Sequence, residues 1–470
     1  MSIKNLPEII QGGMGVNISS PELAKMVSKL GQQGTISGTA LEWVMVRSLQ
    51  MGDPGEHFRR VLAGFPFPDM VKEIMNKFYV KGGIPKNTPF KGIPHVGFNP
   101  SNLFIALLIC SNFAVVRLAK EGHDNPISIN YLEKIALPHV HALYGAILGG
   151  VDIITMGAGI PLQIPPLISD IVEGNDCTYS IPVSGTNIRS SSVNFSPEQF
   201  FGEKPKNLKK PKFLPIISSN LLANLFLKKS PEGSVDGFVV EEPTAGGHNA
   251  PPRRMDPGAL PGAPPVYGQK DVIDYDEMSK LGIPFWIGGS HASPEKLRYA
   301  KSVGAAGIQA GSIFALAEES GMVPELRTRL RKLGYDGEVN IRTDSRISPT
   351  GFPFKVAELE GSIAENTVYN DRVRVCNKGL LVTPYEKEGD RIGYRCSAEP
   401  EDKFTKKGGN PVELAGRGCL CNGLLATAGF GDSVEPPIIT LGDDLSFLPI
   451  LMKHNADTYY AKDVINYLLS

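Results

Sequence analysis

The sequence predicts a (β/α)8 barrel, the TIM-barrel fold, with a helical insertion and a C-terminal extension. Short apolar stretches, many of them ending in glycine, alternate with stretches of helical periodicity. Each strand–helix–strand unit requires a parallel pair of strands, because the crossover returns the chain to the same end of the sheet. At 470 residues the chain can hold a barrel of roughly 250–350 residues and an appendage. The structural alternative is a doubly wound parallel sheet.

The first unit follows this pattern from its first strand. Residues 8–11 are a short apolar strand, and residues 12–15 form a glycine-rich turn after it. A Ser-Pro pair at 20–21 supplies a capping hydroxyl and a proline at the first helical position. Gly31 ends that helix, and residues 34–38 form the second strand.

The segment 41–124 is too long for a single crossover. It contains helical patterns around 56–62 and 70–78, followed by a bridge rich in proline and glycine at 82–94. We therefore interpret residues from about 65 to 125 as an insertion.

Two segments compete for the third strand. One ends in Asn99 and the other, residues 126–130, ends in Asn130. We favour the second, because a helical segment and then a good fourth strand at 151–157 follow it.

The last four strands complete the predicted barrel. They cover residues 213–218, 235–241, 283–289 and 307–312. The barrel would then occupy residues 1–338, and residues 339–470, which are richer in turns and charges, would form the C-terminal extension.

Glycines stand at the carboxyl ends of the seventh and eighth strands. Gly288, Gly289 and Gly311 would let backbone N–H groups approach an anion. In a TIM barrel, phosphate usually binds at these two strand ends. The simpler alternative is two ordinary turns in a glycine-rich chain.

Composition excludes some classes of partner. The formal net charge of −1 provides no field to attract nucleic acid or anionic membrane. The N-terminus lacks a signal-peptide core, and the apolar run 103–110 is too short to span a bilayer. We expect a cytoplasmic protein with a small-molecule substrate.

His248 is the candidate catalytic residue. It follows the sixth strand just after Gly246 and Gly247, and its ordinary pKa near neutrality suits proton transfer. The alternative is a loop histidine bonded to a neighbouring carbonyl. His291 and His123 are weaker loop candidates, and a separate pair, His139 and His141, is interpreted as structural.

Four cysteines cluster in the last hundred or so residues: Cys376, Cys396, Cys419 and Cys421. Four thiolates could bind zinc or an iron–sulfur cluster. Their spacing lacks the paired CxxC motifs of such sites, and buried cysteine also serves as an apolar side chain. We predict no metal and keep these four as the candidate ligands.

Several motifs together resemble one enzyme family. They are residues 9–14, Val240-Glu241 with 245–248, 287–289, and 307–312 with 318–320. In this order they resemble the nitronate monooxygenase (2-nitropropane dioxygenase) family of FMN-dependent TIM barrels, which includes flavin-dependent enoyl reductases. The resemblance covers roughly residues 6–330.

The resemblance implies that FMN lies across the barrel mouth. Its phosphate would meet the glycines of the last two strands, its ring would lie beside the first turn, and two side chains would hydrogen-bond the flavin. The implied cofactor-binding residues are Gly12, Gly13, Met14, Asn130, Glu241, Gly246, Gly247, Gly288, Gly289, Gly311 and Ser312. His248 would act as base or acid.

The implied function is oxidation of nitronates or nitroalkanes with O2. An FMN-dependent reductase of enoyl thioesters, with NAD(P)H as donor, is the alternative, and a flavin-binding subunit without turnover is a second alternative. Glu241 stands where the monooxygenases commonly have Gln, and Thr244 replaces an acidic residue. These departures leave the substrate open, and the oligomeric state is open as well.

Overall fold

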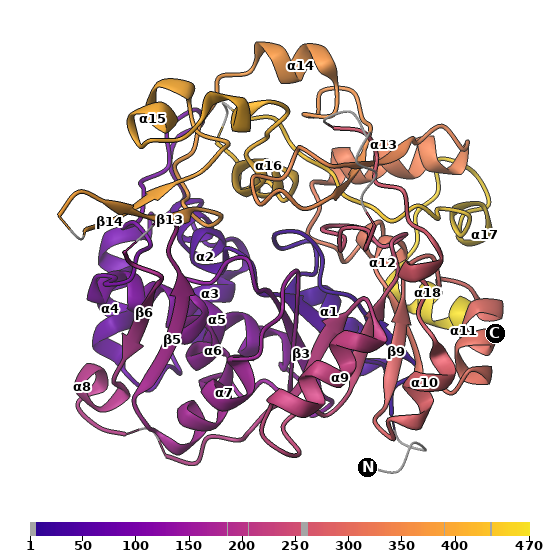
Figure 1. Cartoon of the computed structure of the whole chain (residues 1–470), viewed down its shortest axis with the longest axis horizontal. Coiled ribbons are helices and arrows are strands. Elements are labelled where there is room, and N and C mark those ends of the chain that lie inside the picture. The colour runs from indigo at the N-terminus through magenta and orange to yellow at the C-terminus, as the bar shows by residue number, and fades with distance from the viewer. Residues whose placement is uncertain (1–5, 186, 205, 255–261, 390, 433–434) are drawn as a thin grey trace.

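Eight parallel strands close into a barrel in the computed structural model, which describes residues 6–185, 187–204, 206–254, 262–389, 391–432 and 435–470 (Figure 1). Their order around the sheet is β1-β10-β9-β8-β7-β4-β3-β2. The strands are β1 (Ile9–Gln11), β2 (Gly34–Ser37), β3 (Ile127–Leu132), β4 (Ile153–Gly157), β7 (Lys212–Ile217), β8 (Phe238–Glu241), β9 (Phe285–Gly288) and β10 (Gly307–Ala310).

The barrel closes between β1 and β2. A parallel bridge joins Ile10 to Gln33, and the Gln33 N–H donates to the Ile9 carbonyl at 3.0 Å. This closure confirms the predicted TIM barrel, and the doubly wound alternative is wrong because such a sheet would leave two open edges.

A small apolar cluster fills the interior of the barrel. Ile10, Ile153, Leu214, Val239 and Trp286 pack together there, one from each of five strands. They alternate along the strands with residues such as Val240 that face the surrounding helices, as the period of two requires.

Helices surround the barrel, and the predicted helix starts are confirmed. Ser20 accepts from the Leu23 N–H at 3.1 Å, and Ser293 accepts from the Lys296 N–H at 3.2 Å. The helices of this part are α1 (Pro21–Lys29), α6 (His139–Leu148), α7 (Ile164–Glu173), α9 (Asn220–Lys229), α10 (Tyr275–Lys280), α11 (Pro294–Ser302), α12 (Ser312–Ala315) and α13 (Pro324–Tyr335).

The chain between β2 and β3 forms four α-helices: α2 (Leu41–Gln50), α3 (His57–Leu62), α4 (Pro68–Phe78) and α5 (Asn102–Ala119). The apolar run starting at Leu103 is longer than the sequence indicated, because α5 continues through Ser111 and Asn112. By length and composition α5 could cross a membrane, but 89% of it is buried inside the protein. Gly145 of α6 lies so close that a Cβ there would be 2.3 Å from the Ile109 carbonyl oxygen. These contacts identify α5 as a core helix, and the boundaries of the insertion stay a prediction.

The choice of the third strand is correct, with one adjustment. β3 contains Asn130 but continues to Leu132, so the asparagine lies within the strand. Asn99 precedes α5, whose N-terminus is capped by Ser101.

Much of the chain after α13 lies over one end of the barrel, whereas its last helix, α18 (Ala461–Leu468), packs beside the barrel helices α1, α11 and α12 (Figure 1). Its other α-helices and strands are β11 (Ile341–Asp344), β12 (Phe354–Ala357), α14 (Asn366–Asp371), β13 (Thr383–Lys387), β14 (Arg391–Arg395), α15 (Glu401–Lys406), α16 (Leu420–Thr427) and α17 (Leu448–Leu451).

A hairpin of β5 (Cys177–Pro182) and β6 (Ser190–Phe195), which the sequence pattern did not indicate, is followed by α8 (Pro197–Phe201). A parallel bridge from Ser184 to Tyr385 joins the hairpin loop to β13.

Helix α2 buries a carboxyl group. Glu42 is 3% exposed, and its Oε1 has no hydrogen-bond partner among the described residues. Burial raises the pKa of Glu42 to about 7, because the charged form loses its hydration.

Glu42→Gln should therefore stabilise the protein increasingly as pH rises. The folded pKa lies above the ordinary 4.5, so wild type loses stability between that value and about pH 7, whereas glutamine does not ionise. The advantage of the variant in free energy of unfolding should be about 2 kcal/mol larger at pH 8 than at pH 5. Urea unfolding at both pH values measures it. The exposed control Glu73→Gln should show no such dependence, and an equal effect of Glu42→Gln at both pH values would contradict a buried neutral carboxyl.

Candidate active site

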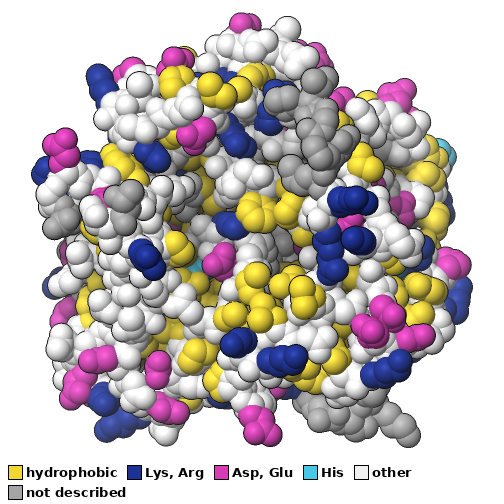
Figure 2. All heavy atoms as spheres, in the orientation of Figure 1, with side chains coloured by type: hydrophobic (Ala, Val, Ile, Leu, Met, Phe, Trp, Pro, Cys, Tyr) yellow, Lys and Arg dark blue, Asp and Glu magenta, His cyan; other side chains and the backbone are white. Residues whose placement is uncertain are grey.

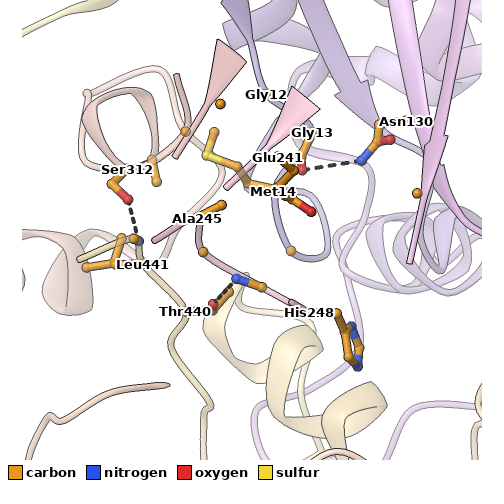
Figure 3. A pocket seen from close by; sticks show the side chains of 18 of the residues that line it. Gly12, Gly13, Met14, Asn130, Glu241, Ala245, His248, Ser312, Thr440 and Leu441 are labelled. Atoms are coloured by element: carbon orange, nitrogen blue, oxygen red, sulfur yellow. Dashed lines mark hydrogen bonds between the residues drawn. The ribbon is translucent and has the colours of Figure 1, made fainter. Parts of the chain in front are cut away.

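One large pocket lies at the carboxyl ends of the barrel strands (Figure 3). The empty space between its walls, including the part that is open solvent, is about 1440 Å³. Every residue that the sequence predicted for the site lines it: Gly12, Gly13, Met14, Asn130, Glu241, Gly246, Gly247, His248, Gly288, Gly289, Gly311 and Ser312. The structure brings these residues together, and their roles toward a cofactor stay predictions.

The turn after β1 is held by a serine. Ser19 Oγ donates to the Gly12 carbonyl at 2.8 Å and accepts from the Met14 N–H at 2.9 Å. The Gln11 side-chain amide also donates to Ser19 Oγ at 2.8 Å. These hydrogen bonds fix the shape of the turn, and the turn also lines the pocket.

Asn130 supports the same turn from β3. Its Nδ2 lies 3.4 Å from the Gly13 carbonyl oxygen, and its Oδ1 accepts from Thr155 at 3.0 Å. A Cβ on Gly13 would lie 2.3 Å from Asn130 Cβ, so only glycine permits this approach.

The two glycine turns after β9 and β10 differ. Gly289 has φ +105°, and a Cβ there would lie 2.9 Å from Thr244 Oγ1, so the turn requires glycine. Gly311 has φ −112°, and a Cβ there would meet only Met14, at 3.5 Å from the sulfur. Neither the backbone conformation nor a close contact therefore requires glycine at position 311, and a side chain there would lie beside Met14.

The C-terminal extension contributes a loop that the motifs did not reveal. Thr440 Oγ1 accepts from the Gly247 N–H, and Ser312 Oγ accepts from the Gly442 N–H, each at 2.7 Å (Figure 3). The Asp443 N–H donates to the Thr244 carbonyl at 3.1 Å. Residues 440–443 thus lie directly against two of the glycine turns.

The extension also makes much of the pocket wall apolar. Side chains from beyond the barrel that line it are Phe354, Leu380, Leu381, Leu420, Leu424, Leu441 and Phe447. Burial among such groups strengthens any polar interaction made in the pocket.

Glu241, at the end of β8, is a half-buried carboxyl that lines the pocket. Burial raises the pKa of Glu241 to about 8, so the group is mostly protonated near neutral pH and can donate a hydrogen bond. Its neighbour Glu242 has two polar partners: its carboxylate accepts from the Tyr275 hydroxyl at 2.6 Å and lies 3.8 Å from His291 Nδ1.

His248 has a hydroxyl partner rather than the carbonyl of the simpler interpretation. Its Nε2 lies 2.7 Å from Ser348 Oγ, and its ring meets the Phe354 ring edge-on at 4.9 Å. Burial and the charge of Lys134 lower the pKa of His248 to about 4. The ring is therefore neutral at pH 7 and can accept a proton.

Of the other histidines, His291 lines the pocket, whereas His123, His139 and His141 have structural roles. His291 is buried, lines the pocket and contacts the Gly289 carbonyl through Nδ1. His123 bonds the Ala119 carbonyl at 2.7 Å, which is a structural role. Burial lowers the pKa of His139 to about 4 and that of His141 to about 3, as expected for neutral core side chains.

The four C-terminal cysteines lie together. The thiols of Cys396 and Cys419 interact with that of Cys376, and Cys421 interacts with Cys419. Hydrogen bonds with Cys376 and Cys421, together with Asn422, lower the pKa of Cys419, whereas hydrogen bonds with Cys396 and Cys419, together with burial, raise the pKa of Cys376. Cys421 also lines the pocket. Among the described residues no set of three or more His, Cys, Asp or Glu side chains is arranged to hold a metal ion, and the four cysteines stay candidate ligands only.

Comparison with known proteins gives only remote likenesses. No family model matches the sequence, and no curated protein matches it. Among solved structures, FabK from Thermotoga maritima has a TM-score of 0.47 and 14% identity, covering 99% of this chain and 93% of that one. A nitroalkane oxidase from Streptomyces ansochromogenes has a TM-score of 0.45 and 11% identity over 99% and 96%. The enoyl reductase domain of MlnA from Bacillus amyloliquefaciens has a TM-score of 0.39 and 13% identity over 77% and 66%.

Elemental analysis tests the cysteine cluster. If the four thiols bind metal, the purified protein should contain about one zinc, or iron with sulfide, per chain. Cys419→Ala should then lose the metal, whereas Cys110→Ala, which removes a buried thiol of α5, should keep it. If wild-type protein contains no metal and all four clustered thiols titrate after denaturation, the cysteines serve as apolar side chains and not as metal ligands.

Proposed function

We propose that this chain is an FMN-dependent oxidoreductase that oxidises nitronates or nitroalkanes with O2. The observation that carries the proposal is the convergence of glycine turns, a neutral histidine and a protonated carboxyl in one pocket at the barrel mouth. The glycine turns follow β1, β8, β9 and β10, and Glu241 and His248 come from the end of β8 and the loop after it.

The pocket residues fit FMN. Gly289 and Gly311 leave backbone exposed where a side chain would fill the space, which suits a terminal phosphate. Met14 and Gly13 line the pocket where the flavin ring would lie, and Asn130 and Glu241 offer hydrogen-bonding groups in the same pocket. When bound, FMN would take electrons from the substrate and pass them to O2.

His248 would supply the base. Its neutral imidazole can remove the proton from the carbon next to a nitro group, while the electron pair of that bond stays on the substrate. Protonated Glu241 would donate a hydrogen bond to the flavin, and the apolar wall would limit water in the pocket.

Reduction of an enoyl thioester with NAD(P)H is the second candidate. Glu241 favours it, because reductase-like members of the resembling family carry Glu where the monooxygenases commonly have Gln. The apolar wall from Leu380 to Leu424 would accommodate an acyl chain. Full FMN occupancy without turnover of either substrate would instead support a flavin-binding subunit.

A small-molecule substrate also agrees with the surface. On the face shown in Figure 2, Lys and Arg side chains are interspersed with Asp and Glu, without a broad field of one sign. We keep the cytoplasmic location as a proposal.

The purified protein should be yellow and carry noncovalent FMN, and Gly311→Asp should abolish its retention. A carboxylate placed at this turn repels the phosphate, which should weaken binding by about 100-fold or more. The fold should survive, because φ at Gly311 suits any residue and a Cβ meets only Met14. FMN absorbance after gel filtration and circular dichroism measure the two effects.

Gly311→Ala is the matched control. It adds the same Cβ without the charge, so FMN retention should fall much less than in Gly311→Asp. A colourless wild-type protein that shows no spectral shift with added FMN would contradict the cofactor proposal. Full retention of FMN by Gly311→Asp would show that the phosphate does not bind at Gly311.

His248→Asn should keep FMN but lose turnover of neutral nitroalkanes. Removing a positioned base typically costs on the order of 10²–10⁴-fold in rate, whereas the preformed nitronate needs no proton removed. Steady-state kinetics on a nitroalkane, its nitronate and an enoyl thioester separate the candidates. In the reductase alternative, flavin reduction by NAD(P)H should survive while enoyl turnover falls. Equal modest losses on all substrates would mean that His248 only shapes the pocket.

A further inference from the structure

We propose that Ser348 and Thr350, two hydroxyl side chains of the C-terminal extension, position the imidazole of His248 and make Nδ1 the nitrogen that exchanges protons with substrate. This inference rests on the proposed function and deepens it. His248 lines the pocket whereas Ser348 and Thr350 do not, so both hydroxyls are positioning residues that act through His248.

The three side chains form one contiguous cluster. Ser348 Oγ lies 2.7 Å from His248 Nε2 and 2.7 Å from Thr350 Oγ1, and Thr350 Oγ1 lies 3.5 Å from the same ring nitrogen. Ser348 is fully buried. No water is needed to explain either hydroxyl contact, because each is within direct hydrogen-bonding distance.

Backbone donors restrict how the protons can be arranged. The Thr350 N–H donates to Ser348 Oγ at 3.3 Å, and the Phe352 N–H donates to Thr350 Oγ1 at 3.4 Å. Each hydroxyl then has one remaining acceptor position and one proton to donate.

Two arrangements satisfy these limits. In the first, Thr350 donates to Ser348 and Ser348 donates to Nε2, so the ring proton sits on Nδ1. In the second, Nε2–H donates to Ser348 and Ser348 donates to Thr350, so Nδ1 carries the lone pair. Conversion of one arrangement into the other requires a turn of both hydroxyls and movement of the ring proton from Nδ1 to Nε2, and only the second leaves a lone pair on Nδ1 for substrate.

Nδ1 is the nitrogen left for substrate. Among the described residues no hydrogen bond is recorded to it, while His248 lines the pocket. When Nδ1 accepts a proton, the ring becomes a cation whose Nε2–H donates to Ser348 Oγ. Lys134, the charged group that acts on the ring, lies 3.9 Å from the Phe352 ring and opposes that cation, so the hydroxyl acceptor offsets part of this repulsion.

The cluster is held firmly by the chain around it. The Arg417 guanidinium donates to the Ser348 carbonyl, and the Gly418 N–H donates to the Ile347 carbonyl at 2.9 Å. On the other side, the Lys355 N–H donates to the Gly247 carbonyl at 2.9 Å. The hydroxyls and the histidine therefore belong to one rigid unit, as positioning requires.

The test uses Ser348→Ala, Thr350→Val and the control Thr350→Ser in the full-length, FMN-loaded protein. Thr350→Val keeps the shape and removes the hydroxyl, whereas Thr350→Ser keeps the hydroxyl. The first measurement is ¹⁵N NMR of histidine-labelled protein, with His248→Asn to assign the His248 signals. Ser348→Ala and Thr350→Val should shift the His248 Nε2 resonance, and Thr350→Ser should not.

The second measurement is kinetics. Loss of a hydrogen bond to a charged ring should lower kcat for a neutral nitroalkane by about 10- to 100-fold in Ser348→Ala. KM and oxidation of the preformed nitronate should be unchanged, and Thr350→Ser should retain wild-type rates. If the hydroxyls had a merely structural role, the substitutions would instead lower the rates on the nitroalkane and on the nitronate alike.

The two measurements separate the possible failures. Unchanged His248 resonances in Ser348→Ala and Thr350→Val would overturn the positioning role, whatever the enzyme turns over. Shifted resonances in a protein that oxidises no nitroalkane would support the positioning role and overturn the proposed function. If Ser348→Ala does not fold, the Thr350→Val and Thr350→Ser pair decides the question.

Discussion

The organisation of the pocket depends on one antiparallel contact between the barrel and the extension. His248 and Phe354 are paired by a bridge, the Lys355 N–H donates to the Gly247 carbonyl, and the Asn249 N–H donates to the Pro353 carbonyl. This pairing fixes the loop after β8 to β12, although the two segments are about a hundred residues apart in sequence. This pairing brings the segment that carries Ser348 and Thr350 beside His248.

Burial sets the chemistry of the two ionisable groups in opposite directions. It keeps the Glu241 carboxyl protonated and the His248 ring unprotonated, so both groups are neutral at pH 7. A site built in this way presents one hydrogen-bond donor and one proton acceptor without a net charge. Apolar side chains of the extension line the same pocket, and Phe354 packs edge-on against the His248 ring.

Much of the fold and most of the barrel side of the site could be predicted from the sequence. Strands and glycine turns are local patterns, and Gly13 and Gly289 occupy positions that accept no side chain. Helix α5 was missed because a helix that is apolar on all sides lacks the periodicity of a surface helix. Ser348 and Thr440 were missed for a different reason. Their positions depend on pairing between distant segments, and an isolated serine or threonine carries no local signal.

The closure of the barrel has a consequence for biosynthesis. β1 pairs with β10, some three hundred residues later, so the first strand lacks one neighbour until most of the barrel has been translated. At a rate of about 5–20 residues per second, that wait lasts roughly fifteen seconds to a minute. The loop at 440–443 leaves the ribosome later still. The barrel strands are therefore synthesised before Thr440, Leu441 and Gly442, which line the pocket.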